Sequence, residues 1–269
     1  MRNLAFIAAL LIGLRPALAQ DAGDIEVDVE LVLAADVSRS MSPSELEIQR
    51  RGYAEAITSN EVLATIGNGM IGRIAVTFME WAGNDLQTVV VPWTLIDSAE
   101  DARAIADTLT SEFHGNMRRT SISGALTEAA RLFEDNGFHG LRRIIDVSGD
   151  GPNNSGGPVV PARDAVLARG IVINGLPLMT MDGFSFRWGI EDLDAYYLNC
   201  VIGGPGAFMI PVYDWSEFAE AVRRKLVLEI AGLPVAPGAV GARLRRANGY
   251  DCMVGEKIWQ RNRQIWMDP

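Results

Sequence analysis

The feature that most limits the fold of this chain is the alternation of apolar, strand-like runs with amphipathic helical segments. The run VDVELVLAA, residues 27–35, starts as an alternating pattern and becomes continuously apolar, as expected for a strand buried on both faces. The same reasoning predicts strands at 142–149, 170–179 and 208–211, and helices at 43–57, 98–112, 121–134, 161–169 and 214–232. Strands that alternate with helices predict an α/β fold with a mostly parallel central sheet covered by helices on both faces.

One pair of runs departs from this alternation. GRIAVTFMEWAG (72–83) and LQTVVVPWTLI (86–96) are joined only by the turn residues Gly83, Asn84 and Asp85. Two strands with so short a connection must run antiparallel. Pro92 lies in the second strand, and proline is tolerated at the edge of a sheet. We therefore expect an antiparallel edge strand.

The N-terminus has the pattern of a signal peptide. Arg2 supplies a positive charge, an apolar stretch runs from Leu4 to Leu14, and Ala17-Leu18-Ala19 forms a small-residue cleavage site. The apolar stretch is too short to span a bilayer comfortably, which disfavours the alternative of an uncleaved anchor. We expect residues 1–19 to be removed, and the mature protein to be periplasmic or secreted.

The charge of the chain excludes one class of function. Of 269 residues, 24 are basic and 34 acidic; loss of Arg2 and Arg15 with the leader would leave 22 basic residues and move the net charge from −10 to −12. A nucleic-acid-binding surface requires the opposite sign. No later stretch approaches the ~20 apolar residues of a membrane span, so a soluble mature protein is expected.

Two cysteines are present, Cys200 and Cys252. In an exported protein an even pair indicates a disulfide, and two buried free thiols are the alternative. Residues 20–232 hold all the predicted strands. The Pro/Gly/Ala-rich segment after Gly232 favours an extended tail, so we interpret 233–269 as a C-terminal extension tied back by the disulfide.

Polar residues follow the predicted strands where a parallel sheet binds its ligands, at the carboxyl ends of the strands. Asp36, Ser38 and Ser40 follow the first strand, Thr120 precedes a helix, and Asp150 closes the strand that ends at 149. These side chains offer only oxygen atoms. An all-oxygen set suits Mg²⁺, Mn²⁺ or Ca²⁺ and is unsuited to zinc or copper, and Mg²⁺ also keeps several waters.

Each of these residues also has a purely structural interpretation. Ser42 and Glu45, with Pro43 between them, form a capping box that needs no further function. Thr120 could be a helix N-cap, as could Ser121 or Ser123. Asp150-Gly151 could be a turn, and Asp36, Ser38 and Ser40 could be turn-forming residues. For the buried Asp146 we expect a structural pairing with Arg142, Arg143 or a backbone group.

In combination, Asp36-Val37-Ser38-Arg39-Ser40, Thr120 and Asp150-Gly151 resemble the metal-ion-dependent adhesion site (MIDAS) of von Willebrand factor type A (VWA) domains. The resemblance implies a doubly wound, Rossmann-like sheet with one antiparallel edge strand. It also implies that Ser38, Ser40 and Thr120 ligate a divalent cation directly, with Asp36 and Asp150 direct or water-mediated. In such sites a partner's Asp or Glu completes the cation's shell.

Longer stretches are similar to an uncharacterised bacterial family of exported VWA-like proteins, and they cover about residues 27–232. They are GRIAVTFMEWAG, RRIIDVSGDGPNN, INGLPLM, YYLNCVIGGPGAF and RRKLVLEIAG. The family is defined by sequence and not by a known activity.

These observations predict a binding module that engages an acidic group of a protein partner through a cation. Asn153 and Asn154 are candidate partner contacts, as is Trp188 in the insertion 180–200; Tyr196 and Tyr197 are either contacts or core. One alternative is a structural or assembly protein of the envelope whose metal site is covered by that insertion. An enzyme is disfavoured, because the only histidines, His114 and His139, lack a catalytic context and no G-x-S-x-G motif occurs; a metal-assisted hydrolase is the enzymatic alternative. The sequence predicts no oligomeric state.

Overall fold

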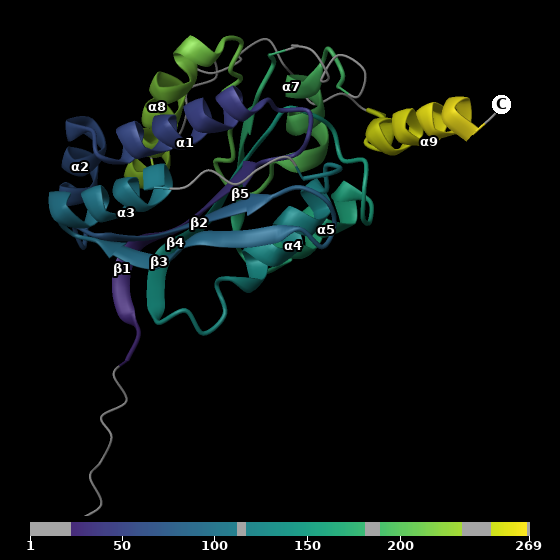
Figure 1. The fold of residues 1–269 in the computed structure, drawn as a ribbon. Coiled ribbons are helices and arrows are strands. Elements are labelled where there is room, and N and C mark those ends of the chain that lie inside the picture. Colours follow the sequence, from purple (N-terminus) through teal and green to yellow (C-terminus); the bar gives the residue numbers. More distant parts are fainter. Residues whose placement is uncertain (1–22, 112–116, 181–188, 233–248, 268–269) are drawn as a thin grey trace, which may run out of the picture.

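A five-stranded mixed sheet forms the centre of the molecule in the computed structural model, which describes residues 23–111, 117–180, 189–232 and 249–267 (Figure 1). The strand order is β3-β2-β1-β4-β5. The strands are β1 (Ile25–Asp36), β2 (Ile74–Trp81), β3 (Gln87–Ile96), β4 (Phe138–Gly149) and β5 (Val172–Pro177). All neighbouring pairs are parallel except β2 and β3, which run antiparallel at the edge. The predicted fold class and its edge hairpin are confirmed.

Helices cover both faces of this sheet (Figure 1). One face carries α1 (Pro43–Ile57), α2 (Asn60–Gly67), α3 (Ala99–Ser111) and α8 (Phe218–Ala231), which is preceded by the 3-10 turn η2 (Trp215–Glu217). The other face carries α4 (Ile122–Arg131), α5 (Val159–Ala168), α7 (Leu193–Tyr196) and the π-helical turn η1 (Tyr197–Val201). The last helix, α9 (Val254–Met267), extends away from these layers.

The central strand β1 supplies both hydrophobic cores. Leu31, Leu33 and Ala35 face the helices α1, α3 and α8, whereas Val32 and Ala34 face α4 and α5. This follows from the period of two along a strand. A strand that is buried on both faces reads as a continuous apolar run, which is what residues 27–35 show.

Three elements differ from the expectations. Helix α2 follows α1 after an N-cap at Ser59, and the hydrophobic spacing had not predicted it. Residues 208–211 do not form the expected strand: Met209 makes one isolated parallel bridge to Gly175 of β5. The C-terminal extension ends in the 14-residue helix α9. The expectation of a tail rested on the glycine and proline residues just after Gly232. These residues precede the helix and do not lie in it.

The expected pairing of Asp146 is wrong. Its carboxylate lies 2.8 Å from the Lys225 ammonium of α8, and both side chains are almost fully buried. Lys225 also pairs with Glu229 one turn later. Arg142 and Arg143 instead donate to backbone carbonyls, those of Glu229, Ile230 and Arg169. A fully buried ammonium group needs a charged partner more than a half-buried guanidinium group does. Helix α8 brings the Lys225 ammonium to the sheet, where it pairs with Asp146.

In the described part of the chain, no helix combines the length and the apolar character needed to cross a membrane. The predicted leader, residues 1–19, lies outside the described residues.

Candidate metal centre

Asp36 and Asp150 lie at the carboxyl ends of the two central strands. β1 and β4 are parallel neighbours with Ala35 opposite Ser148, so both chains leave the sheet at the same edge. Asp36 is the last residue of β1, and Asp150 directly follows β4. The sheet therefore brings together two carboxylates that are more than a hundred positions apart in sequence.

The loop after β1 turns its polar side chains toward each other. The Ser38 backbone N–H donates to Asp36 Oδ1 at 2.7 Å. The Ser38 and Ser40 hydroxyls lie 3.0 Å apart, and Ser40 Oγ donates to Asp150 Oδ1 at 2.8 Å. A continuous row of oxygens thus links the end of β1 with the end of β4.

The next residues of the same loop have a separate task. Ser42 is the N-cap of α1: its hydroxyl accepts from the Glu45 N–H, and Glu45 accepts from the Ser42 N–H at 2.6 Å. This reciprocal pair is the predicted capping box. Local capping therefore accounts for Ser42 and Glu45 but not for Ser38 and Ser40.

Thr120 lies on a third segment, which borders the loops after β1 and β4. Met117 forms a parallel bridge with Ser38, and the Thr120 N–H donates to the side chain of Asn154 at 3.0 Å. The Asn154 N–H in turn donates to the Thr120 carbonyl at 2.9 Å. The N-cap of α4 is Ser121, so capping does not account for Thr120. The loop 117–121 is thereby fixed beside both the β1 and the β4 loops.

The site is closed on nearly all sides. Asp36 is 0% exposed, Ser38 1%, Thr120 5% and Asp150 7%. Only Ser40 is half-buried. An ion would therefore reach these oxygens from the side of Ser40.

The electrostatics of the site disfavour two negative charges without a cation. Burial raises the pKa of Asp36 well above its usual range, and the nearby Asp150 carboxylate raises it further. Burial also raises the pKa of Asp150 to about 6, against the hydrogen bond from Ser40. In addition, Asp36 Oδ2 is buried and has no hydrogen-bond partner among the residues that the structure describes. A bound cation would compensate both carboxylates, so the residues present fit a hard divalent ion.

Across the described ranges, no group of three or more His, Cys, Asp and Glu side chains is placed to hold a metal ion. A metal site in the described part of the chain would therefore need hydroxyl ligands as well as carboxylates. The candidate set has both: Asp36, Ser38, Ser40, Thr120 and Asp150.

The other predicted contact residues differ in their placement. Asn153 is fully buried: its side chain accepts from the Ser123 N–H and donates to Glu256 of α9 at 2.7 Å. Asn154 is half-buried and holds Thr120 as described. Trp188 lies outside the described residues. Tyr196 and Tyr197 are both fully buried and belong to the core.

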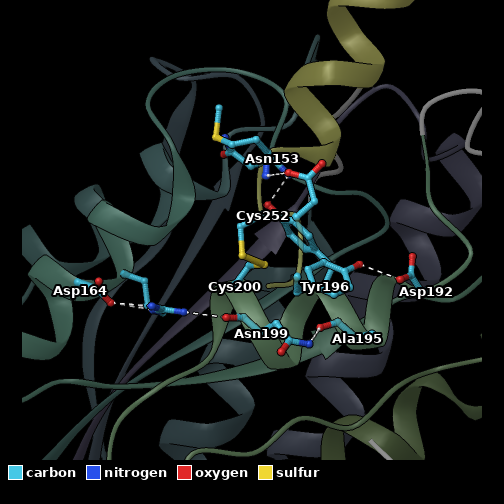
Figure 2. The surroundings of a disulfide bond; sticks show 12 residues. Asn153, Asp164, Asp192, Ala195, Tyr196, Asn199, Cys200 and Cys252 are labelled. Carbon is cyan, nitrogen blue, oxygen red and sulfur yellow. Dashed lines mark hydrogen bonds and ion pairs between the residues drawn. A yellow bond between two sulfur atoms is a disulfide. The ribbon is translucent and has the colours of Figure 1, made fainter. Parts of the chain in front are cut away.

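A disulfide joins Cys200 of η1 to Cys252, with an S–S distance of 2.01 Å, as predicted (Figure 2). It brings the start of α9 against the loop after β4. There Glu256 accepts from Asn153, whose backbone N–H donates to the Tyr196 hydroxyl at 3.2 Å (Figure 2). These contacts were not anticipated, because nothing in the sequence around Glu256 indicates which loop it meets.

Three exposed arginines lie next to the site. Arg39 stands between the two serines, and Arg118 and Arg119 directly precede Thr120. The Arg119 guanidinium lies 4.7 Å from the ring centre of Trp259 in α9. Among the described residues, neither Arg39 nor Arg118 forms an ion pair. The bridge between Ser38 and Met117 places these two arginines on neighbouring segments.

With the geometry defined, sequence comparison identifies the family. The model of a family described as "Protein of unknown function (DUF1194)" matches residues 26–234. The chain belongs to this family. No curated protein matches the sequence. The family assignment therefore comes without an assigned activity.

Solved structures show what this DUF1194 chain resembles in three dimensions. A structure of proximal thread matrix protein 1 from the mussel byssus, described with a zinc-occupied MIDAS motif, superposes with a TM-score of 0.58 at 16% identity. The match covers 77% of this chain and 49% of the mussel chain, so the present chain spans about half the length of that relative.

Two bacterial structures match the same fold. The pilus adhesin SpaC from Lactobacillus rhamnosus GG has a TM-score of 0.56 at 12% identity, covering 78% of this chain and 31% of the adhesin. A von Willebrand factor type A protein from Catenulispora acidiphila has a TM-score of 0.52 at 18% identity, covering 76% of this chain and 43% of that one. The chain therefore has a VWA-type fold.

Proposed function

We propose that this protein is an exported VWA-like binding module that holds a divalent cation at the β1, β4 and pre-α4 loops and uses it to engage an acidic group of a protein partner. The observation that carries the proposal is the row of oxygens from Asp36 to Asp150, which contains two buried carboxylates and the unpartnered Asp36 Oδ2. Such an arrangement is unfavourable without a positive charge.

In this proposal, the hydroxyls of Ser38, Ser40 and Thr120 are direct ligands, and Asp36 and Asp150 bind directly or through water. When bound, the cation supplies an open coordination position and positive charge for a partner's Asp or Glu. Mg²⁺ is the first candidate because the set is all oxygen and Mg²⁺ retains waters; Mn²⁺ and Ca²⁺ follow. Zinc belongs among the ions tested, because the mussel protein's MIDAS motif holds it.

The arginines beside the site support an acidic partner. In a chain with a formal net charge of −10, the exposed residues Arg39, Arg118 and Arg119 lie in the loops that carry Ser40 and Thr120. Positive charge around a cation raises the encounter rate with an acidic ligand and orients it. Export to the periplasm or the medium is supported by the leader-like sequence 1–19 and by the disulfide.

Cation binding is tested by thermal unfolding in EDTA and in millimolar Mg²⁺, Mn²⁺, Ca²⁺ or Zn²⁺. A ligand at 100 times its Kd stabilises the folded state by about 2.7 kcal/mol, so the wild type should melt at a higher temperature with at least one ion. Asp36→Ala should abolish the rise. A wild-type protein that responds to none of the four ions would contradict the proposal.

Partner engagement is tested by a pull-down from the native envelope fraction in Mg²⁺ and in EDTA. The proposal expects a protein that is retained by the wild type in Mg²⁺, is lost in EDTA and with Asp36→Ala, and is lost when its own contacting Asp or Glu is replaced. Cation binding without any Mg²⁺-dependent partner would instead favour the structural alternative with a covered site.

A further inference from the structure

Three buried polar atoms that have no hydrogen-bond partner within the described part of the chain surround Gly149, directly behind the candidate metal centre. They are Asp36 Oδ2, the Tyr197 hydroxyl and the Trp81 indole nitrogen. All three residues are 0% exposed. Folded proteins leave only a small minority of such atoms unpaired, and here three of them lie around one glycine.

Their proximity follows from two independent observations. The position that a Cβ atom on Gly149 would take lies 3.0 Å from Asp36 Oδ2, 3.0 Å from the Tyr197 hydroxyl and 3.2 Å from Trp81 Cζ2, the ring carbon that is joined to the indole nitrogen through Cε2. In the sheet, Trp81 of β2 is also the register partner of Asp36. The absence of a side chain at Gly149 is thus what allows the three to approach.

The chemistry of the three atoms is complementary. An ionised carboxylate only accepts hydrogen bonds, an indole N–H only donates, and a tyrosine hydroxyl donates one. Oδ1 of Asp36 already accepts from the Ser38 N–H at 2.7 Å, whereas Oδ2 has no donor. The unpaired acceptor Asp36 Oδ2 and the unused donors of Tyr197 and Trp81 therefore match in kind.

We propose that Tyr197 and Trp81 are positioning residues for Asp36: in the cation-loaded protein the Tyr197 hydroxyl and the Trp81 indole N–H donate to Asp36 Oδ2, directly or through one water, and fix the carboxylate for metal binding. This rests on the proposed function of the site. Groups behind a metal ligand commonly fix its orientation, and their loss costs about 10–100-fold in metal affinity.

The position of Tyr197 in the chain suits this role. It opens the π-helical turn η1, a rare geometry that is frequent at functional sites. The same turn carries Cys200, which is tied to Cys252, and the preceding Tyr196 accepts from the Asn153 N–H. The turn is therefore held from two sides, and it presents the Tyr197 hydroxyl to Asp36 from the helical layer opposite α1.

The test compares two substitutions of buried tyrosines. Tyr197→Phe removes a hydroxyl that has no partner, so the metal-free protein should be as stable as the wild type or more stable, while the Kd for Mg²⁺ should rise about 10-fold. Tyr53→Phe is the matched control. Its hydroxyl donates to Ser148 at 3.2 Å on the other face of β4, so its loss should lower the stability of the metal-free protein and leave the Kd unchanged.

Affinity is measured by isothermal titration with MgCl₂ or MnCl₂, and stability by urea unfolding in EDTA. A Tyr197→Phe Kd within twofold of the wild type would overturn the positioning role and leave the proposed function intact. A wild type that binds no cation would overturn both. A Tyr197→Phe protein that is less stable without metal, with an unchanged Kd, would show a merely structural role and also overturn the inference.

Discussion

The Ser40 hydroxyl donates a hydrogen bond to Asp150 Oδ1 across 2.8 Å, although the two residues are 110 positions apart in the chain. Ser42, two residues after Ser40, instead caps α1 and has its side-chain contacts within that helix start, with Glu45 and Ser44. Two serines of one short loop thus serve different purposes. The difference can be measured, because one hydroxyl lies in the candidate metal centre and the other does not.

Ser40→Ala and Ser42→Ala should therefore change different quantities: the first the response to the cation, and the second the stability of the metal-free protein. Ser40→Ala removes a proposed ligand, so the cation-dependent rise in melting temperature should fall strongly or vanish. Ser42→Ala removes an N-cap and should lower the free energy of unfolding by about 1 kcal/mol, with the cation-dependent rise preserved. Differential scanning calorimetry in EDTA and in Mg²⁺ checks both. Equal cation responses in the two variants would argue against Ser40 as a ligand.

The arginines lead to a prediction about the partner. Arg39→Ala and Arg118→Ala should slow association with the Mg²⁺-dependent partner and weaken the salt dependence of the association rate, because both remove positive charge beside the site. The affinity for Mg²⁺ alone should not fall. Arg103→Ala is the control, since Arg103 is exposed on α3, a helix that carries none of the proposed site residues. Surface plasmon resonance at several salt concentrations measures the rates; an identical salt dependence in Arg118→Ala and Arg103→Ala would refute the prediction.

Much of the fold could be predicted from sequence because the deciding signals are local. The apolar run before Asp36 indicates a central strand, the short turn at residues 83–85 requires an antiparallel hairpin, and Ser42 with Glu45 marks a helix start. The sequence also predicted that polar residues follow the strands at the binding edge of the sheet. The structure shows that β1 and β4 are adjacent parallel strands, so the polar residues after them lie near each other.

The contacts that could not be predicted depend on how distant elements pack. Asp146 has arginines close by in sequence, yet α8 delivers Lys225 to it through the core. Nothing in the local pattern of Tyr197 or Trp81 shows that they meet behind Asp36, because their approach depends on the small volume of Gly149. Helix α9 was missed for a different reason: the glycine- and proline-rich segment before it dominated the composition.

The buried cluster of Lys225, Asp146 and Glu229 predicts a pH dependence of stability. Burial raises the pKa of Glu229 from 4.5 to about 7, in opposition to Lys225 and with support from the charge of Asp146. Because the folded state holds this proton more tightly than the unfolded state, the contribution of Glu229 to stability is complete below about pH 4.5 and is lost as the pH rises through about 7.

Glu229→Gln should therefore flatten the decline in stability between pH 5 and pH 8. Relative to the wild type, the variant should gain up to about 3 kcal/mol over this range, and its Oε1 can still accept from Asn174. Urea unfolding in EDTA at pH 5, 6, 7 and 8 gives the two curves. Parallel curves for the wild type and Glu229→Gln would mean that Glu229 does not titrate there.

The disulfide predicts a large difference in stability between oxidised and reduced protein. Cys200 and Cys252 close a loop with a sequence separation of 52, and a loop of this length restricts the unfolded chain by about 4 kcal/mol. In the folded state the same bond holds α9 beside Asn153, where Glu256 accepts at 2.7 Å. Its removal should thus lower the free energy of unfolding and loosen α9 as well.

A double substitution, Cys200→Ser with Cys252→Ser, separates these effects from those of the reductant. The wild type should lose stability in dithiothreitol, whereas the double variant should unfold at the same lower urea concentration with and without it. Faster tryptic cleavage after Lys257 in the double variant would report the loosened helix, since Lys257 lies in the second turn of α9 and its side chain is exposed. Unchanged unfolding on reduction of the wild type would show that packing alone, and not the covalent link, keeps the C-terminal segment on the loop that follows β4.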